Sequence, residues 1–166
     1  MSRAVEAVDR LSRLLGHLAA WLTLGCVALV FALVLARYGF DRSSIALQEA
    51  VLWLHAAAFL LGLSWALSED QHVRVDLFRQ RWSARTRAAV ELAGLALFLL
   101  PFCGFALWIS GDYVAASWRV GESSREPGGL PALYLLKTLI PVAFGLLALQ
   151  GLAQALRALD TLRGRT

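Results

Sequence analysis

Charged residues are scarce in this chain. Asp, Glu, Lys and Arg make up 17% of its 166 residues, whereas they make up about 25% of a typical soluble domain. Four long segments contain none of them: residues 14–36, 50–68, 92–111 and 138–156. A soluble four-helix bundle would place polar residues on about half of each helix surface. Because these segments are apolar on all sides, the pattern excludes that class.

Cysteine is also rare, and catalytic motifs are absent. Cys26 and Cys103 lie inside uncharged segments, and neither belongs to a CxxC pair. We therefore expect small apolar side chains rather than a disulfide or metal ligands. No phosphate-binding glycine loop, GxSxG, HExxH or dinucleotide fingerprint occurs. The sequence therefore predicts no enzymatic activity, no cofactor and no metal.

Each uncharged segment has the length of a transmembrane helix. A helix that rises ~1.5 Å per residue needs about 20 residues to cross ~30 Å of hydrocarbon. We predict an all-α integral membrane protein, with residues 1–166 as a single four-span domain. A charged helical segment precedes the first span and no cleavage pattern follows it, so we interpret it as retained rather than as a signal peptide. The predicted spans are residues 14–36, 48–68, 90–111 and 134–156.

The basic residues predict the orientation. With four spans, both termini and the loop 69–89 share one side, which carries eleven basic residues against five on the other. Cytoplasmic segments are enriched in Lys and Arg, so we predict N-in/C-in topology in a bacterial inner membrane. Residues 37–47 and 112–133 are then periplasmic loops. The net charge of +4 belongs to this pattern and does not indicate a nucleic-acid partner.

The loop 69–89 resembles a short amphipathic interfacial helix. Val75, Phe78 and Trp82 recur at helical spacing, which would place Trp82 at the level of the lipid headgroups. Ser83 is a candidate N-cap for the third span. Residues 4–15 show a similar stripe, and this segment either lies on the membrane or extends the first span. The loop arginines assigned to orientation and headgroup contact are Arg74, Arg79, Arg81, Arg85 and Arg87.

Small residues repeat every four positions in the first two spans. Such rows let helix backbones approach closely in lipid, where no hydrophobic force drives association. We predict that they pack within the bundle or against a larger partner. Pro101 should kink or locally open the third span, and Pro141 is either a kink or a first-turn proline. The rows are Ala28, Ala32 and Ala36, then Ala58, Gly62 and Ala66.

Few ionisable residues lie in the spans. Glu49 is either the proton or cation site of an autonomous proton-coupled exporter or a helix N-terminal carboxylate in a local ion pair with Arg42, and we favour the second. His55 could ligate haem in a membrane anchor of an oxidoreductase. Haem usually needs a second axial ligand, and no other span has a central His. We therefore interpret His55 as a packing residue.

The predicted outer loop before the last span is rich in turn formers. Residues 121–131 read GESSREPGGLP, which forbids a regular helix. This segment is either a solvated connector or a contact surface for a periplasmic partner. Its candidate contact residues are Gly121, Glu122, Arg125 and Glu126.

The second span and its exit, residues 47–78, resemble the small permease subunit (DctQ-like family) of tripartite ATP-independent periplasmic (TRAP) transporters. The shared features are an acidic residue that opens the span, Glu49, then Gly62, then the run from His72 to Asp76. Residues 121–156 resemble the same family through Pro141 and Leu149-Gln150. One difference is that Ala46-Leu47-Gln48 precede Glu49, where many members have a Trp.

The resemblance implies a subunit role. In TRAP systems a periplasmic substrate-binding protein delivers an organic acid to two membrane subunits, and sodium movement drives uptake. The large subunit contains the substrate and sodium sites. The small one is expected to anchor that subunit in the lipid as a scaffold and to help dock the binding protein. The implied partners are therefore the large membrane subunit, the binding protein and membrane lipids.

Overall fold

The computed structural model describes residues 3–69 and 82–164, and all regular structure in those ranges is helical. Four helical stretches are long and apolar enough to cross a membrane: α1, α2, the continuous stretch from α4 to α5, and α6. The chain is thus an all-α protein with four helices capable of spanning a membrane, as predicted. The elements are α1 (Arg3–Phe40), α2 (Ile45–Ser68), α4 (Ala84–Gly94), the π-helical segment η1 (Leu95–Leu99), α5 (Leu100–Arg119) and α6 (Leu133–Leu162).

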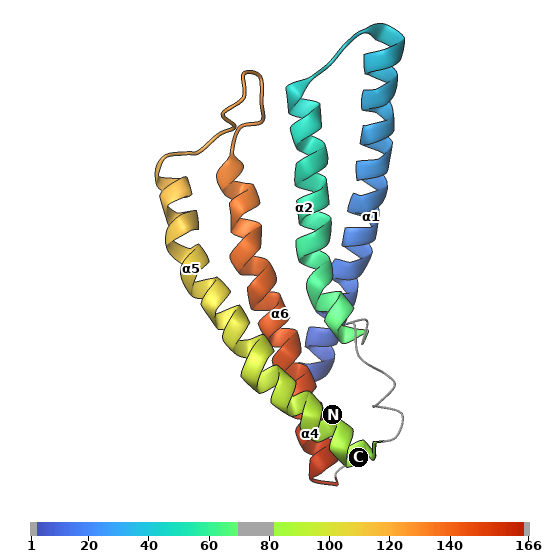
Figure 1. Ribbon diagram of the computed structural model, residues 1–166, viewed down its shortest axis with the longest axis vertical. Helices are drawn as coiled ribbons and strands as arrows, with labels where there is room; N and C mark the ends of the chain where they lie inside the picture. The colour runs from blue at the N-terminus through green and yellow to red at the C-terminus, as the bar shows by residue number, and fades with distance from the viewer. Residues whose placement is uncertain (1–2, 70–81, 165–166) are drawn as a thin grey trace.

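Helix α6 is the central element of the bundle. It packs against α1, α2, α4 and α5, while α1 packs mainly along α2. Figure 1 shows the start of α1, the end of α6 and the start of α4 together at one end, which we call the terminal end. The connections 41–44 and 120–132 lie at the opposite end, the loop end. The assignment of the terminal end to the cytoplasm stays a prediction.

Helix α1 is a single uninterrupted helix of 38 residues. At ~1.5 Å per residue it is about 57 Å long, well beyond the ~30 Å of hydrocarbon. The amphipathic N-terminal segment therefore extends the first span as the same helix. The predicted interfacial helix lies largely in 70–81, so it falls outside the described residues, together with Arg74, Arg79 and Arg81.

Local signals in the sequence fix several helix boundaries. Ser83 is the N-cap of α4, and its Oγ accepts a hydrogen bond from the Thr86 N–H at 3.1 Å, as predicted. Pro101 follows η1, where the Leu100 N–H bonds to the Leu95 carbonyl five residues back. This local widening is the predicted response to a residue that lacks an N–H. Pro141 lies inside α6 rather than in its first turn.

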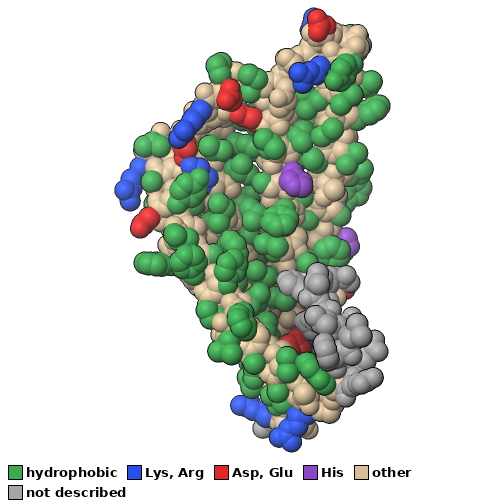
Figure 2. Space-filling model, viewed as in Figure 1, with side chains coloured by type: hydrophobic (Ala, Val, Ile, Leu, Met, Phe, Trp, Pro, Cys, Tyr) green, Lys and Arg blue, Asp and Glu red, His purple; other side chains and the backbone are tan. Residues whose placement is uncertain are grey.

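The buried core is small for a chain of this size. Leu67, Cys103 and Leu147 form its centre, and Phe102 packs edge-on against Phe144 at 5.6 Å between ring centroids. Apolar side chains cover much of the length of the surface, while charged side chains lie toward its two ends (Figure 2). An exposed apolar surface of this extent needs lipid or another protein to cover it. Exposed large side chains include Trp21 (70%), Phe31 (64%), Phe98 (74%) and Trp108 (79%).

Candidate functional site

At the loop end, the carboxylate of Glu49 on α2 is bound by the loop that precedes α6. Its Oε2 accepts a hydrogen bond from the backbone N–H of Leu130 at 2.6 Å, and its Oε1 accepts one from the Ser124 hydroxyl. The loop also closes on itself, because the Ser124 N–H donates to the Leu130 carbonyl at 3.0 Å. One carboxylate therefore joins α2 to a loop about 80 residues further along the chain.

A second carboxylate attaches the same loop to α5 and α6. Lys137 on α6 forms an ion pair with Glu122, and the Ser117 hydroxyl on α5 donates to Glu122 at 2.6 Å. The Lys137 ammonium also lies 4.2 Å from the centroid of the Tyr113 ring. The hydrogen bonds from Lys137 and then Ser117 hold the pKa of the Glu122 carboxyl below its usual value.

The loop is compact as well as attached. Gly129 lies so close to Ser124 that a Cβ there would overlap its side chain and would come within 2.8 Å of the Glu49 carboxylate. Gly128 has a φ of 78°, which a residue with a side chain rarely adopts. Trp118 at the end of α5 donates to the Thr138 hydroxyl at 2.9 Å. The loop end is therefore held in place by contacts with its own chain, whether it acts as a connector or as a contact surface.

The residues predicted for this loop have different environments. Glu122 is half-buried and bonded, whereas the side chains of Arg125 and Glu126 are exposed. Gly121 supplies a left-handed turn, with a φ of 57°. The structure gives Glu49 different partners from the Arg42 expected from the sequence. Sequence reasoning missed Ser124 and the Leu130 N–H, and the only signal for the former was the Ser-Ser pair beside Glu122.

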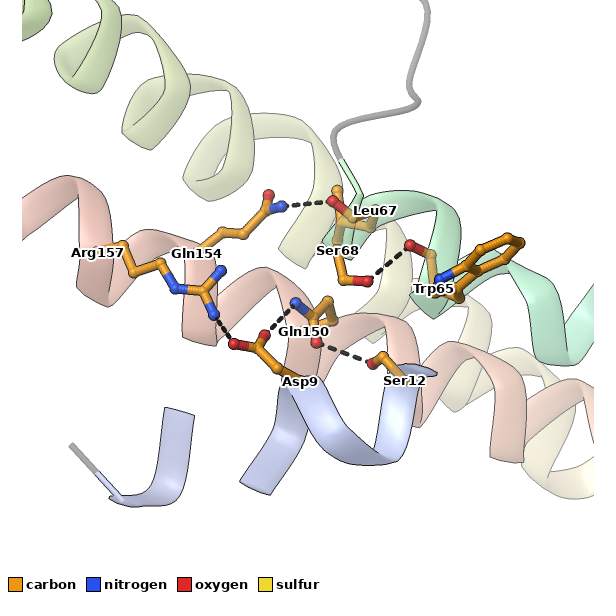
Figure 3. A network of polar contacts seen from close by, with 8 residues as sticks. All are labelled: Asp9, Ser12, Trp65, Leu67, Ser68, Gln150, Gln154 and Arg157. Carbon is orange, nitrogen blue, oxygen red and sulfur yellow. Dashed lines mark hydrogen bonds and ion pairs between the residues drawn. The ribbon is translucent and has the colours of Figure 1, made fainter. Parts of the chain in front are cut away.

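At the terminal end, a polar network joins α1 to α6 (Figure 3). Asp9 forms an ion pair with Arg157 and accepts a hydrogen bond from Gln150 Nε2 at 3.0 Å. Ser12 Oγ donates to Gln150 Oε1 at 2.9 Å. Gln150 is completely buried, so its amide is satisfied from α1 on both sides. Polar side chains are well suited to fixing the register of two helices that are otherwise apolar.

Gln154, one turn further along α6, connects the network to α2. Its Nε2 donates to the Leu67 carbonyl at 2.5 Å, which is one of the last carbonyls of α2. Gln150 belongs to the Leu149-Gln150 pair that resembles the family, but this network was not predicted from the sequence. The available signal was two glutamines four residues apart, Gln150 and Gln154, in an otherwise apolar span.

Some residues of the two predicted small-residue rows are half-buried between helices, and others are exposed on the surface. Helix α1 contacts α2 through Gly16 and Ala19: a Cβ on Gly16 would overlap the Trp65 indole, and a Cβ on Gly62 would lie 3.9 Å from the Ala19 Cβ. The predicted row on α2 therefore faces α1 at Gly62. In the predicted row on α1, Ala28 and Ala32 are exposed. The half-buried members of both rows are Ala36, Ala58, Gly62 and Ala66.

The remaining candidates lie on the surface. His55 is exposed on α2, and Trp82, Arg85 and Arg87 are exposed at the start of the third span. Within residues 3–69 and 82–164, no three His, Cys, Asp or Glu side chains are grouped so that they could hold a metal ion.

The family model described as "Tripartite ATP-independent periplasmic transporters, DctQ component" matches residues 26–161. The match begins within α1 at residue 26, includes α2, α4, η1, α5 and the loop before α6, and ends at residue 161 in the last turn of α6. No curated protein and no solved structure matches the chain. DctQ components are parts of transporters rather than enzymes, and they work with a large membrane subunit and a binding protein. This multi-pass membrane protein belongs to the DctQ family, the small membrane subunits of TRAP transporters.

Proposed function

We propose that this chain is the small membrane subunit of a sodium-coupled, binding-protein-dependent TRAP transporter that imports an organic acid across the bacterial inner membrane. It acts as a scaffold for the large subunit and helps to dock the periplasmic binding protein. The observation that carries the proposal is that three acidic side chains bind other parts of the same chain. Glu49, Glu122 and Asp9 each bind another part of the same chain, so they support architecture rather than transport chemistry.

The exposed apolar faces support the scaffold role. Phe31 on α1 and Trp108 on α5 are among the large side chains that the chain itself leaves uncovered. Ala28 and Ala32 form an exposed strip of small residues on α1. Such a strip allows a helix of another subunit to approach closely. We infer that α1 contributes to the contact with the large subunit.

The attached loop supports the docking role. A loop that is already ordered loses less conformational entropy on binding than a flexible one. Glu49 and Lys137 hold residues 122–130 from two different helices, while Arg125 and Glu126 remain exposed. In the proposed N-in/C-in orientation this surface faces the periplasm.

Cross-linking tests the docking role. The variant Arg125→Cys, carrying a photoreactive maleimide in the assembled transporter, should cross-link to the binding protein. The matched control is Glu69→Cys, an exposed residue at the terminal end, which should not. Cross-linking from Glu69→Cys but not from Arg125→Cys would reverse the proposed orientation. Cross-linking from other loop-end positions but not from Arg125→Cys would argue against this loop as the contact.

A further inference from the structure

The four long helices form two pairs that separate toward the loop end. Helix α1 packs along α2, and α5 packs along α6. In Figure 1, α2 and α6 lie close together at the terminal end and apart at the loop end. Burial agrees with this arrangement: the buried residues of α2, Ser64 and Leu67, lie near its terminal end, and those of α6 begin at Ala143, about three turns from its start. The two pairs are therefore packed more closely at the terminal end than at the loop end.

Two hydrogen bonds of Glu49 cross between the pairs at the loop end. Glu49 lies near the start of α2, whereas the two donors to its carboxylate, the Ser124 hydroxyl and the Leu130 N–H, belong to the loop that joins α5 to α6. This loop is covalently continuous with the second pair. Movement of α2 away from α6 at this end would therefore break both bonds of Glu49, while Leu67 stayed in the core.

The loop also contains a strained residue. Ala132, the N-cap of α6, has a φ of 65°, in the left-handed region that residues with a Cβ rarely adopt. Such a conformation persists only where the surrounding contacts impose it. Leu130, whose N–H binds Glu49, is two residues before Ala132. Release of Glu49 would free Ala132 to adopt an unstrained conformation, so the strain favours the released loop while the hydrogen bonds favour the attached one.

The exposed surface of the loop is connected to Glu49 through one hydroxyl group. Ser124 Oγ donates to the Glu49 carboxylate and accepts a hydrogen bond from the Glu126 N–H at 3.1 Å. Arg125, between these two loop residues, is exposed, and so is Glu126. A partner that contacts Arg125 and Glu126 therefore acts on the same short segment that binds Glu49.

We propose that Glu49 is a releasable latch. When its hydrogen bonds are formed, the two helix pairs are held together at the loop end. When they break, α2 and α6 spread there while the terminal end stays packed. A partner that binds the attached loop at Arg125 and Glu126 shifts the population toward the latched state, because a ligand favours the conformation that it binds more tightly. The identification of that partner as the binding protein rests on the proposed function, whereas the latch itself does not.

Distances between two spin labels on the full chain in lipid nanodiscs test the latch. The labels are attached at Leu52→Cys on α2 and Arg119→Cys on α5, both exposed, in a Cys26→Ala background; Cys103 is fully buried. The wild type should show mainly a short distance. Glu49→Gln should increase the population of a longer distance roughly tenfold, because it replaces hydrogen bonds to a charged group with weaker ones. An unchanged distance distribution in Glu49→Gln would overturn the latch.

Two controls separate opening at the loop end from general loosening of the fold. Labels at Glu69→Cys and Asp160→Cys, both exposed at the terminal end, should report the same distance with and without Glu49→Gln, and an equal change at both ends would overturn the latch. Ala132→Gly, added to Glu49→Gln, should reduce the long-distance population several-fold, because Gly adopts the left-handed region without steric cost. An unchanged or increased population would overturn the role of strain at Ala132.

The binding protein that Arg125→Cys captures provides the test of control by a partner. It should shift the Glu49→Gln labels toward the short distance and should bind Glu49→Gln several-fold more weakly than the wild type, because coupling between two equilibria is reciprocal. Binding without any effect on the distances would overturn control of the latch by this partner. If the chain alone shows the expected distances and the protein does not bind, docking at this loop is wrong and the latch stands.

Discussion

The carboxylate of Glu49 accepts a hydrogen bond from the backbone N–H of Leu130 at 2.6 Å, although the two residues are 81 positions apart. This bond and the one from Ser124 connect the start of the second span to the loop that precedes the fourth. With the contacts of Glu122 to Ser117 on α5 and to Lys137 on α6, the loop is held by three helices and not only by its own turns.

Replacing Glu49 with Gln should loosen this loop. A neutral amide accepts weaker hydrogen bonds than a carboxylate, and only one of its two terminal atoms can accept at all. Trypsin should therefore cleave after Arg125 several-fold faster in Glu49→Gln, while the large subunit still co-purifies. The matched control is Glu69→Gln at the terminal end, which should leave cleavage unchanged. If Glu49→Gln cleaves at the wild-type rate, Glu49 does not order the loop.

Gly16 should tolerate substitution far less than Gly62. A Cβ on Gly16 would overlap the Trp65 indole, whereas a Cβ on Gly62 would make an ordinary contact with Ala19. Overpacking costs about 1–3 kcal/mol, so Gly16→Ala should lower the free energy of unfolding in detergent by about that amount. Gly62→Ala should be neutral or slightly stabilising, because Ala favours the helix by up to about 1 kcal/mol. Equal effects would contradict the α1–α2 packing described here.

Asp9 and Arg157 should behave as a coupled pair. Asp9→Asn removes the anion and leaves a cation whose side chain is only 31% exposed. Breaking a fully buried pair costs about 3–5 kcal/mol, and partial exposure reduces this to about 1–3 kcal/mol. A double-mutant cycle with Arg157→Gln should show that the combined loss is smaller than the sum of the single losses. Additive losses would mean that the two side chains do not interact in the membrane-embedded protein.

The contribution of Glu122 to the stability of the fold should decrease as the pH falls. Its pKa in the folded protein is lowered from 4.5 by Lys137 and Ser117, so the ionised form is stabilised by folding. This stabilisation is fully present above pH 4.5 and is lost as the pH falls through the lower folded pKa. The apparent Tm of wild type relative to Glu122→Gln should therefore be constant from pH 7 to about 5 and should converge below. A Tm difference that does not begin to shrink as the pH falls below 4.5 would contradict the ion pair.

The number of helices able to span a membrane was predictable because it depends mainly on the transfer of long apolar segments from water to lipid. Each uncharged segment of about 20 residues has a strong preference for lipid that no local alternative offsets. The Ser83 cap was equally predictable, since a Ser just before a helical segment offers an acceptor to the N–H groups of its first turn. The local opening at Pro101 follows from a missing N–H, which is also a property of one residue.

The contacts between helices were not predictable in the same way. Ala28, Ala32 and Ala36 have the spacing of a packing row, but Ala28 and Ala32 are exposed in this chain, whereas Gly16 and Ala19 lie against α2. Packing of the exposed row against a larger partner stays a prediction. Residue spacing alone does not tell which small residues of α1 face α2, because that depends on the position of side chains on α2 such as the Trp65 indole. The partner of Glu49 was hidden for a related reason. Every residue except proline has a backbone N–H, so the sequence does not indicate which one binds Glu49, and only the folded loop shows that it is the N–H of Leu130.

The most direct test of the central claim is purification of the tagged chain from its native membranes in mild detergent, with mass spectrometry of the intact complexes. A scaffold subunit should be recovered in one-to-one ratio with a much larger, very hydrophobic membrane protein, and that pair should transport a carboxylate only when a binding protein and sodium are supplied. Recovery of the chain alone, as a monomer or homodimer with transport activity of its own, would contradict the account.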